Sequence, residues 1–137
     1  MENEFLSIIM PSYRLASSIA ANVRRVDAVL ATLVIRYEII VVDDGSGDGT
    51  DSVLSELAND DSFAGRAHLV PVILTVNGGK GNALKAGLKA SKGSYILLLD
   101  ADLDLAPEML PNFFNIMKRE NADIVIGSKR HPDSDID

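Results

Sequence analysis

A short apolar run that ends in closely spaced carboxylates constrains this chain most strongly. The run Tyr95–Leu99 is followed by Asp100, Asp102 and Asp104. An apolar run of this length predicts a strand that is buried on both faces, as in the parallel sheets of α/β proteins. Open α/β sheets bind ligands at the carboxyl ends of their strands. The three acidic side chains are therefore expected at a ligand-binding edge.

Carboxylates this close repel one another unless a positive group lies among them. Mg²⁺ binds one or two protein carboxylates and completes its coordination with phosphate oxygens and water. The acidic cluster therefore predicts a divalent-cation site, if the chain also binds a phosphate-bearing ligand. The alternative is a solvated acidic loop, which would be the preferred interpretation of this segment taken alone.

Further apolar runs alternate with amphipathic segments along the chain. Strands are predicted at Phe5–Met10, Tyr37–Val42, Leu69–Val76, Ser94–Leu99 and Ala122–Ile126. Helices are predicted within Ser17–Leu33, after an N-cap at Thr50, at Asn82–Ser91 and within Pro107–Glu120. This alternation predicts a parallel sheet with right-handed crossovers. Pro71 lacks a backbone N–H and places the third strand at an edge of the sheet.

Composition narrows the class of protein. The 137 residues, of which 47% are hydrophobic, fit one α/β domain over 1–137, with 127–137 as a polar tail. The net charge of −7 argues against a nucleic-acid-binding protein. The chain has no cysteine, which excludes disulfides and thiolate metal sites. No apolar run approaches the ~18 residues of a membrane span, so we expect a soluble, cytoplasmic chain.

Polar clusters follow every predicted strand, and in a parallel sheet they meet at one edge. The clusters are Pro11–Arg14, Asp43–Ser46, Asn77–Gly81, Asp100–Asp104 and Gly127–His131. Their convergence favours a metal at the acidic cluster of Asp100, Asp102 and Asp104 over a solvated acidic loop. We expect Asp104 to cap a helix or to lie outside the coordination sphere.

Three common phosphate and metal motifs do not fit. Gly45–Gly49 lacks the G-x-G-x-x-G spacing of dinucleotide-binding loops. Gly81 follows Lys80 where a Walker A loop needs Ser or Thr. Leu105 replaces the glycine that an EF-hand loop needs after its first three acidic ligands.

Five segments together resemble the inverting family 2 glycosyltransferases with a GT-A fold, and especially the dolichyl- or polyprenyl-phosphate sugar synthases. The segments are Ser7–Tyr13, Val41–Thr50, Asn77–Ala83, Leu99–Asp102 and Gly127–Lys129. The resemblance implies a Rossmann-like, mostly parallel sheet of order 3-2-1-4 flanked by helices. We expect the fifth strand further along this sheet or antiparallel to it.

The resemblance also implies a donor site for a UDP- or GDP-linked sugar. Asp100 and Asp102 would hold Mg²⁺ or Mn²⁺, and Asp102 is the expected catalytic residue. The residues expected to frame the base and ribose are Pro11, Tyr13, Val42 and Asp44, with Asp43 beside them. Ala101 would lie against the ribose or pyrophosphate, and Lys129 would reach the diphosphate.

The chemistry of these side chains agrees with such a site. Asp44 can accept a hydrogen bond from a base N–H or a ribose hydroxyl, and Tyr13 can stack. Lys80 and Lys129 can add positive charge. A polyprenyl phosphate acceptor is already anionic, so its attack on the sugar needs no strong general base.

Two departures from the family pattern stand out. Arg14 and Leu15 replace the Asn-Glu pair that usually follows the tyrosine, so one nucleotide-binding carboxylate is missing. Members of the family also continue beyond the fifth strand into an acceptor-binding half. We therefore expect a truncated donor-binding half, with membrane contact only through the missing segments and the full-length form at the cytoplasmic face of the membrane.

Two other functions remain open at this stage. The chain could be a non-catalytic nucleotide-binding module that dimerises through apolar surface where the missing half would pack. A sugar nucleotidyltransferase with a related fold is disfavoured, because Pro11–Arg14 does not supply the Gly-rich loop with Arg and Lys that follows the first strand of those enzymes.

Overall fold

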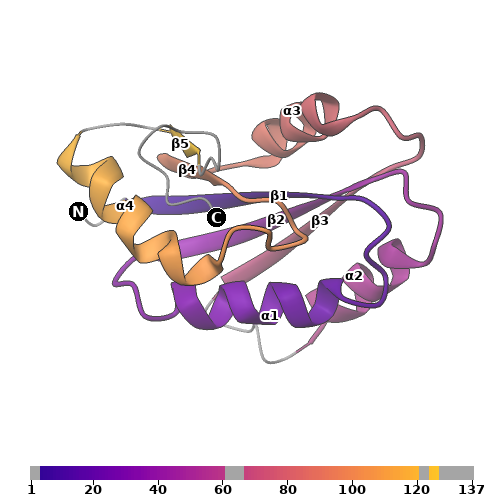
Figure 1. Cartoon of the computed structure of the whole chain (residues 1–137), viewed down its shortest axis with the longest axis horizontal. Coiled ribbons are helices and arrows are strands. Elements are labelled where there is room, and N and C mark those ends of the chain that lie inside the picture. Colours follow the sequence, from indigo (N-terminus) through magenta and orange to yellow (C-terminus); the bar gives the residue numbers. More distant parts are fainter. Residues whose placement is uncertain (1–3, 61–66, 121–123, 127–137) are drawn as a thin grey trace.

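The computed structural model describes residues 4–60, 67–120 and 124–126. The elements are β1 Phe5–Ser12, α1 Ile19–Leu30, β2 Arg36–Asp44, α2 Thr50–Ala58, β3 Ala67–Leu74, α3 Lys80–Ala90, β4 Tyr95–Leu98, the 3₁₀ helix η2 Pro107–Met109, α4 Leu110–Arg119 and β5 Ile124–Ile126. Helix α3 covers one face of the sheet, and α1, α2 and α4 lie on the other face (Figure 1). The predicted alternation of strands and helices is therefore confirmed.

The described strands form one sheet of order β3-β2-β1-β4-β5. All four neighbouring pairs are parallel. The predicted order 3-2-1-4 is confirmed, and β5 lies beside β4 and is parallel to it rather than antiparallel. Pro71 lies in the edge strand β3, opposite Val41, as its missing N–H predicts.

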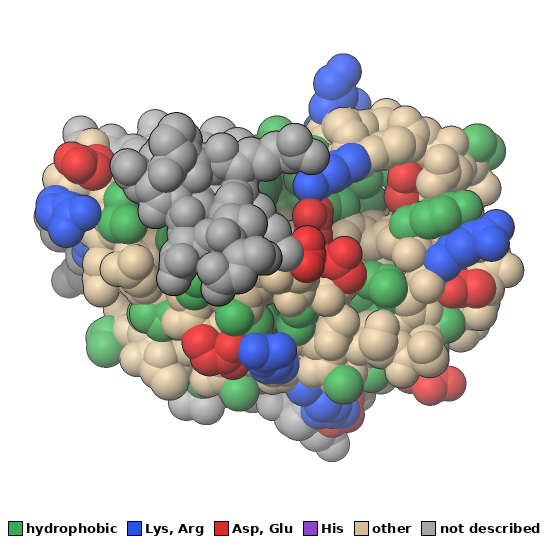
Figure 2. Space-filling model, viewed as in Figure 1, with side chains coloured by type: hydrophobic (Ala, Val, Ile, Leu, Met, Phe, Trp, Pro, Cys, Tyr) green, Lys and Arg blue, Asp and Glu red, His purple; other side chains and the backbone are tan. Residues whose placement is uncertain are grey.

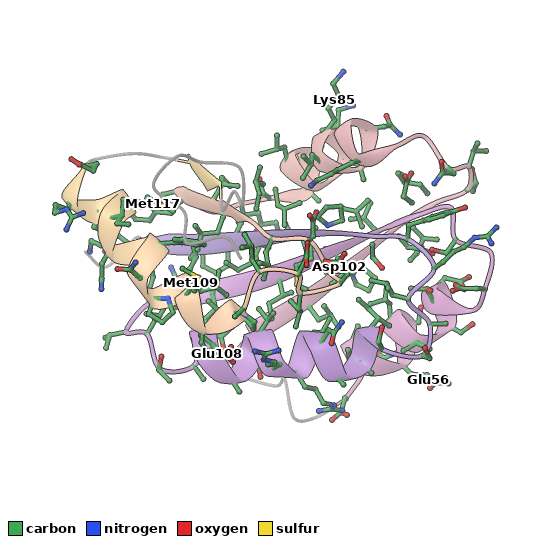
Figure 3. All side chains as sticks on the ribbon, viewed as in Figure 1. Glu56, Lys85, Asp102, Glu108, Met109 and Met117 are labelled. Atoms are coloured by element: carbon green, nitrogen blue, oxygen red, sulfur yellow. The ribbon has the colours of Figure 1, made fainter. Side chains whose placement is uncertain are left out.

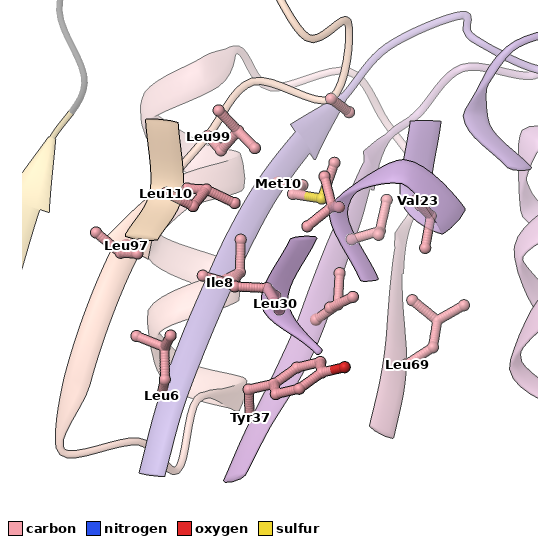
Figure 4. Close-up of a cluster of buried hydrophobic side chains, with 14 of the residues drawn as sticks. Leu6, Ile8, Met10, Val23, Leu30, Tyr37, Leu69, Leu97, Leu99 and Leu110 are labelled. Atoms are coloured by element: carbon pink, nitrogen blue, oxygen red, sulfur yellow. The ribbon is translucent and has the colours of Figure 1, made fainter. Parts of the chain in front are cut away.

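The larger part of the core lies between the sheet and α1, α2 and α4. Alternate residues of β1 point into this layer, which contains Leu6, Ile8 and Met10 with no exposed surface (Figure 4). The helix predicted within Ser17–Leu33 is confirmed as α1, and its side chains at i, i+4, i+7 and i+11 are all fully buried: Ile19, Val23, Val26 and Leu30. Each such aliphatic side chain contributes about 1.5–3 kcal/mol through burial.

The opposite face is covered closely by α3 because this helix has small residues. Ala83 and Gly87 are its buried positions. A Cβ built on Gly87 would lie 2.4 Å from Cγ2 of Ile9, so any side chain there would force Ile9 or the helix to shift. The absent side chain therefore sets the short distance between α3 and the sheet.

Several predicted boundaries are wrong by a few residues, and two have clear causes. Strand β1 does not stop at Pro11 but pairs with β2 as far as Ser12 opposite Asp43. The carbonyl of Pro11 accepts from the N–H of Ala101, so the missing N–H of Pro11 is on the side of β4. Proline therefore ends only the ladder with β4, whose last pair is Ile9 with Leu98.

The start of α2 is also different from the prediction. Gly49, with φ of +97°, is the N-cap, and Thr50 is the first helical residue. Asp48 Oδ1 accepts hydrogen bonds from the backbone N–H of Thr50, at 3.1 Å, and from its hydroxyl. The carboxylate of Asp48 therefore does the capping expected of Thr50, and these bonds lower the pKa of Asp48.

Pro111 lies in the first turn of α4, where its missing N–H costs no helical hydrogen bond. No helix among the described residues is long and apolar enough to cross a membrane.

Candidate functional site

A pocket of about 490 Å³ opens at the carboxyl ends of the central strands. Nine of its eleven lining residues come from four of the five clusters predicted to converge: Pro11, Ser12, Tyr13, Asp44, Asn77, Gly79, Lys80, Asp100 and Asp102. The other two are Leu15 and Ala83. Acidic side chains gather beside a basic one near the centre of the face in Figure 2. Pockets of this volume accommodate ligands of nucleotide size.

Lys80 and Asp100 form an ion pair across this pocket. Lys80 is the first residue of α3, and Asp100 comes two residues after β4. The Lys80 Nζ lies 2.9 Å from both carboxylate oxygens of Asp100. The two side chains are 63% and 44% exposed, so solvent and ligands can reach the pair.

Asp102 lies in the same pocket, in a tight turn after β4 (Figure 3). Its Oδ1 accepts from the backbone N–H of Asp104 at 3.0 Å, and the N–H of Leu103 donates to the carbonyl of Asp100. Leu103 has a φ of +56°, which a leucine rarely adopts. The turn thus brings Asp100 and Asp102 to one pocket, whose lining does not include Asp104.

The two carboxylates fit a divalent cation that obtains further ligands elsewhere. Within the described residues, no group of three or more His, Cys, Asp or Glu side chains could hold a metal ion. Two carboxylates with ligand phosphate oxygens and water suit Mg²⁺ or Mn²⁺. The Lys80 ammonium already places one positive charge on Asp100, which shows that this carboxylate can accept a cation.

Asp44 anchors the loop that leads into α3. Its side chain is 4% exposed. Its Oδ1 accepts from the N–H of Gly78 and its Oδ2 from the N–H of Gly79, both at 2.9 Å. Asn77 Nδ2 donates to Asp44 Oδ2 at 3.2 Å and to its backbone carbonyl at 3.0 Å. The carboxylate expected to bind a base or ribose thus holds the loop before Lys80, while it also lines the pocket.

Asp43 joins two other loops from the opposite face of β2. It is buried and accepts a hydrogen bond from the Ser46 hydroxyl. Ser46 Oγ in turn accepts from the N–H of Arg14 at 2.7 Å. Arg14 has a φ of +55°, and this bond helps to keep its backbone in the left-handed conformation. Asp43 is not among the pocket-lining residues, so it acts on the pocket through these loops.

Tyr13 presents an exposed ring at the pocket, as predicted. It is 44% exposed, and the guanidinium carbon of Arg14 lies 5.3 Å from the centre of its ring. This distance is within the range of a cation–π contact. Arg14, which stands where an asparagine was expected, therefore packs against the tyrosine.

Two residues carried over from the family resemblance do not reach the pocket with their side chains. Val42 is fully buried in the layer under α3, and Ala101 is fully buried in the main core. Neither residue is among those that line the pocket, and their expected contacts with base, ribose or pyrophosphate stay predictions. Strand alternation explains Val42, because it follows Ile40 on the same inward face. Lys129 lies outside the described residues.

Sequence reasoning did not assign Ser12, Asn77 or Gly79 to the site, although each lies in a cluster that follows a strand. Ser12 is notable because its hydroxyl is buried and has no hydrogen-bond partner within the described residues. The position of Ser12 in a polar cluster at the end of a strand could have assigned it to the site from the sequence.

The fold and the pocket define a Rossmann-like α/β protein with an acidic ligand site. The sequence profile of glycosyl transferase family 2 matches residues 7–137, and the chain belongs to this family. An undecaprenyl-phosphate 4-deoxy-4-formamido-L-arabinose transferase of Klebsiella pneumoniae is 37% identical over 125 residues, which cover 91% of this chain and 36% of that protein. A Yersinia pestis protein of the same name is 36% identical over 120 residues, which cover 88% of this chain and 35% of that protein. The chain thus spans about a third of the length of these relatives.

Solved structures show the same GT-A fold. The mannosyltransferase PcManGT from Pyrobaculum calidifontis, in complex with GDP-Man and Mn²⁺, matches 82% of this chain and 32% of its own with a TM-score of 0.64 and 28% identity. S. aureus TarS 1-349 in complex with UDP-GlcNAc matches 86% of this chain and 32% of its own with a TM-score of 0.60 and 24% identity, and it supports the fold alone.

Proposed function

We propose that this chain binds the nucleotide-diphosphate sugar of a glycosyltransferase reaction, and that the acceptor is a polyprenyl phosphate. The observation that carries the proposal is the pocket in which Asp100, Asp102 and Lys80 lie beside the exposed ring of Tyr13. Two carboxylates, one ammonium and one aromatic ring are suited to a metal-bound diphosphate with an attached base.

Each of these side chains has a separate role in the proposal. Tyr13 stacks on the base, and Asp100 and Asp102 hold Mg²⁺ or Mn²⁺. The bound metal ion stabilises the diphosphate as a leaving group. Asp44 keeps the loop before α3 in place through its bonds to Gly78 and Gly79. An anionic acceptor oxygen then attacks the anomeric carbon from the opposite side, with inversion.

The comparisons support this choice of donor and acceptor. The curated relatives are named as transferases that act on undecaprenyl phosphate. PcManGT binds GDP-Man with Mn²⁺. Since a polyprenyl phosphate is a membrane lipid, we also propose that the reaction takes place at a membrane surface, on its cytoplasmic face.

Titration calorimetry with UDP and GDP, each with and without Mn²⁺, tests the proposal. One nucleotide should bind in the presence of Mn²⁺, and Asp100→Asn should weaken this binding at least tenfold. Lys85→Met, on the exposed side of α3, serves as the control and should bind normally. Absence of nucleotide binding with Mn²⁺, or an Asp100→Asn variant that binds like the wild type, would refute the proposed function.

A further inference from the structure

The ion pair between Lys80 and Asp100 uses a carboxylate that the proposed function gives to the metal. Lys80 Nζ is 2.9 Å from both oxygens of Asp100, so it occupies the position from which a cation contacts this carboxylate. A divalent ion and an ammonium group cannot both occupy that position, because like charges this close repel strongly. One of them must leave when the other binds.

The Lys80 side chain can change position while its backbone stays in place. It begins α3 directly after Gly78 and Gly79, whose N–H groups are held by the buried carboxylate of Asp44. Its side chain is 63% exposed, and exposed ion pairs are weak enough to exchange. The ammonium can therefore swing within the pocket while its attachment point stays fixed.

A ligand diphosphate would give this ammonium another anionic partner in the same pocket. We propose that Lys80 is an exchangeable counter-ion, which neutralises Asp100 in the ligand-free pocket and transfers to the diphosphate when the metal takes Asp100. This inference rests on the proposed function. It assigns to Lys80 two opposite effects: it competes with the free metal and it assists the nucleotide.

The exchange also links the two ligands. Without a diphosphate, the metal must displace an ammonium that has no other anion to pair with. With a diphosphate present, the ammonium is neutralised there and Asp100 is released to the metal. Each ligand thereby lowers the cost of binding the other, which is positive coupling through one side chain.

Removal of the Lys80 charge in the full chain tests the exchange. Binding of Mn²⁺ alone is measured by electron paramagnetic resonance of the free ion, and binding of UDP and of GDP at saturating Mn²⁺ by calorimetry. Lys80→Met should bind Mn²⁺ alone about two- to fivefold more tightly, which is the strength of an exposed ion pair. It should bind the nucleotide more weakly. Lys80→Arg, which keeps the charge, should reverse at least part of both changes relative to Lys80→Met.

Lys85→Met is the matched control, because Lys85 is exposed on the same helix and points away from the sheet (Figure 3). Changes of opposite sign in the two affinities at position 80, and none at position 85, would support the exchange, since a general structural defect weakens both. Unchanged or weaker Mn²⁺ binding in Lys80→Met would overturn it. In that case the proposed function would still stand, provided that the wild type binds metal and nucleotide and that Asp100→Asn loses both. If the wild type binds no Mn²⁺ even with nucleotide, both proposals fail.

Discussion

At the scale of single residues, two adjacent aspartates have different tasks because a strand turns successive side chains to opposite faces. Asp43 points toward the loop at Ser46, and Asp44 toward the loop at Gly78 and Gly79. Neither assignment follows from the acidic pair alone. The partners are loops that only the folded sheet brings together.

Asp44→Ala should destabilise the fold, because it removes the acceptor of two backbone N–H groups and one of the two acceptors of the Asn77 amide. Loss of charge-assisted bonds at a buried site costs about 2–3 kcal/mol. The free energy of unfolding in urea measures this change. Glu56→Ala, which alters an exposed acid on α2, is the control and should change stability by less than about 0.5 kcal/mol. A similarly small change at Asp44 would contradict its role as a loop anchor.

At the scale of secondary-structure elements, the two helix layers differ in how they meet the sheet. The layer of α1 uses large aliphatic side chains, whereas α3 approaches closely through Ala83 and Gly87. The small side chains of Ala83 and Gly87 permit this close approach. The contact with Ile9 could not be predicted, because it depends on how the helix is placed along β1.

Gly87→Ala should lower the free energy of unfolding by about 1–3 kcal/mol, since its Cβ would lie 2.4 Å from Ile9 Cγ2. This is the reverse of the usual effect of Gly→Ala in a helix. Gly81→Ala in the same helix is the matched control, because a Cβ there meets nothing within 4 Å. It should stabilise the chain by up to about 1 kcal/mol. Urea unfolding compares the two variants, and equal effects would be inconsistent with the packing described for α3.

A second prediction at this scale concerns the segment that precedes β1. The Tyr95 hydroxyl donates a hydrogen bond to Oε2 of Glu4 at 2.6 Å, and Lys118 Nζ donates one to Oε1 of Glu4 at 3.0 Å. These bonds link the segment before β1 to β4 and α4. The Tyr95 hydrogen bond, with that of Lys118, lowers the pKa of Glu4 from 4.5 to about 2. Ionised Glu4 therefore stabilises the fold fully above about pH 4.5, and this contribution disappears as the pH falls toward 2.

Glu4→Gln should make the loss of stability on acidification less steep between these two pH values. Urea unfolding at a series of pH values measures the slope for the wild type and the variant. Glu56→Gln should keep the wild-type slope. The same slope in Glu4→Gln and the wild type would show that the pKa of Glu4 does not change on folding.

At the scale of the whole molecule, local sequence patterns predicted the architecture more completely than they predicted the residues of the site. The parallel sheet, the edge position of β3 and the buried stripe of α1 follow from alternation, Pro71 and helical spacing, whereas the strand order was implied by the family resemblance. Asp100, Asp102, Lys80 and Tyr13 were found because their loops follow strands whose ends share an edge. The burial of the Val42 and Ala101 side chains could not be predicted, since motif position does not tell which face of the backbone a side chain occupies.

The link between the acidic pair and Lys80 also required the whole fold. The two segments are 20 residues apart and meet only because α3 begins at the edge where β4 ends. The same topology leaves two carboxylates for a cation. Within the described residues, no third acidic side chain joins them to complete a metal site. In the proposed function, oxygens of a ligand diphosphate would complete the coordination.

The most direct test of this account is the affinity for Mn²⁺ measured with and without saturating nucleotide, using the one of UDP and GDP that binds. We predict weak binding of Mn²⁺ alone and an affinity at least tenfold higher with nucleotide, because the diphosphate supplies the missing oxygens. Equal affinity for Mn²⁺ in the two conditions would contradict the central claim that metal and nucleotide share this pocket.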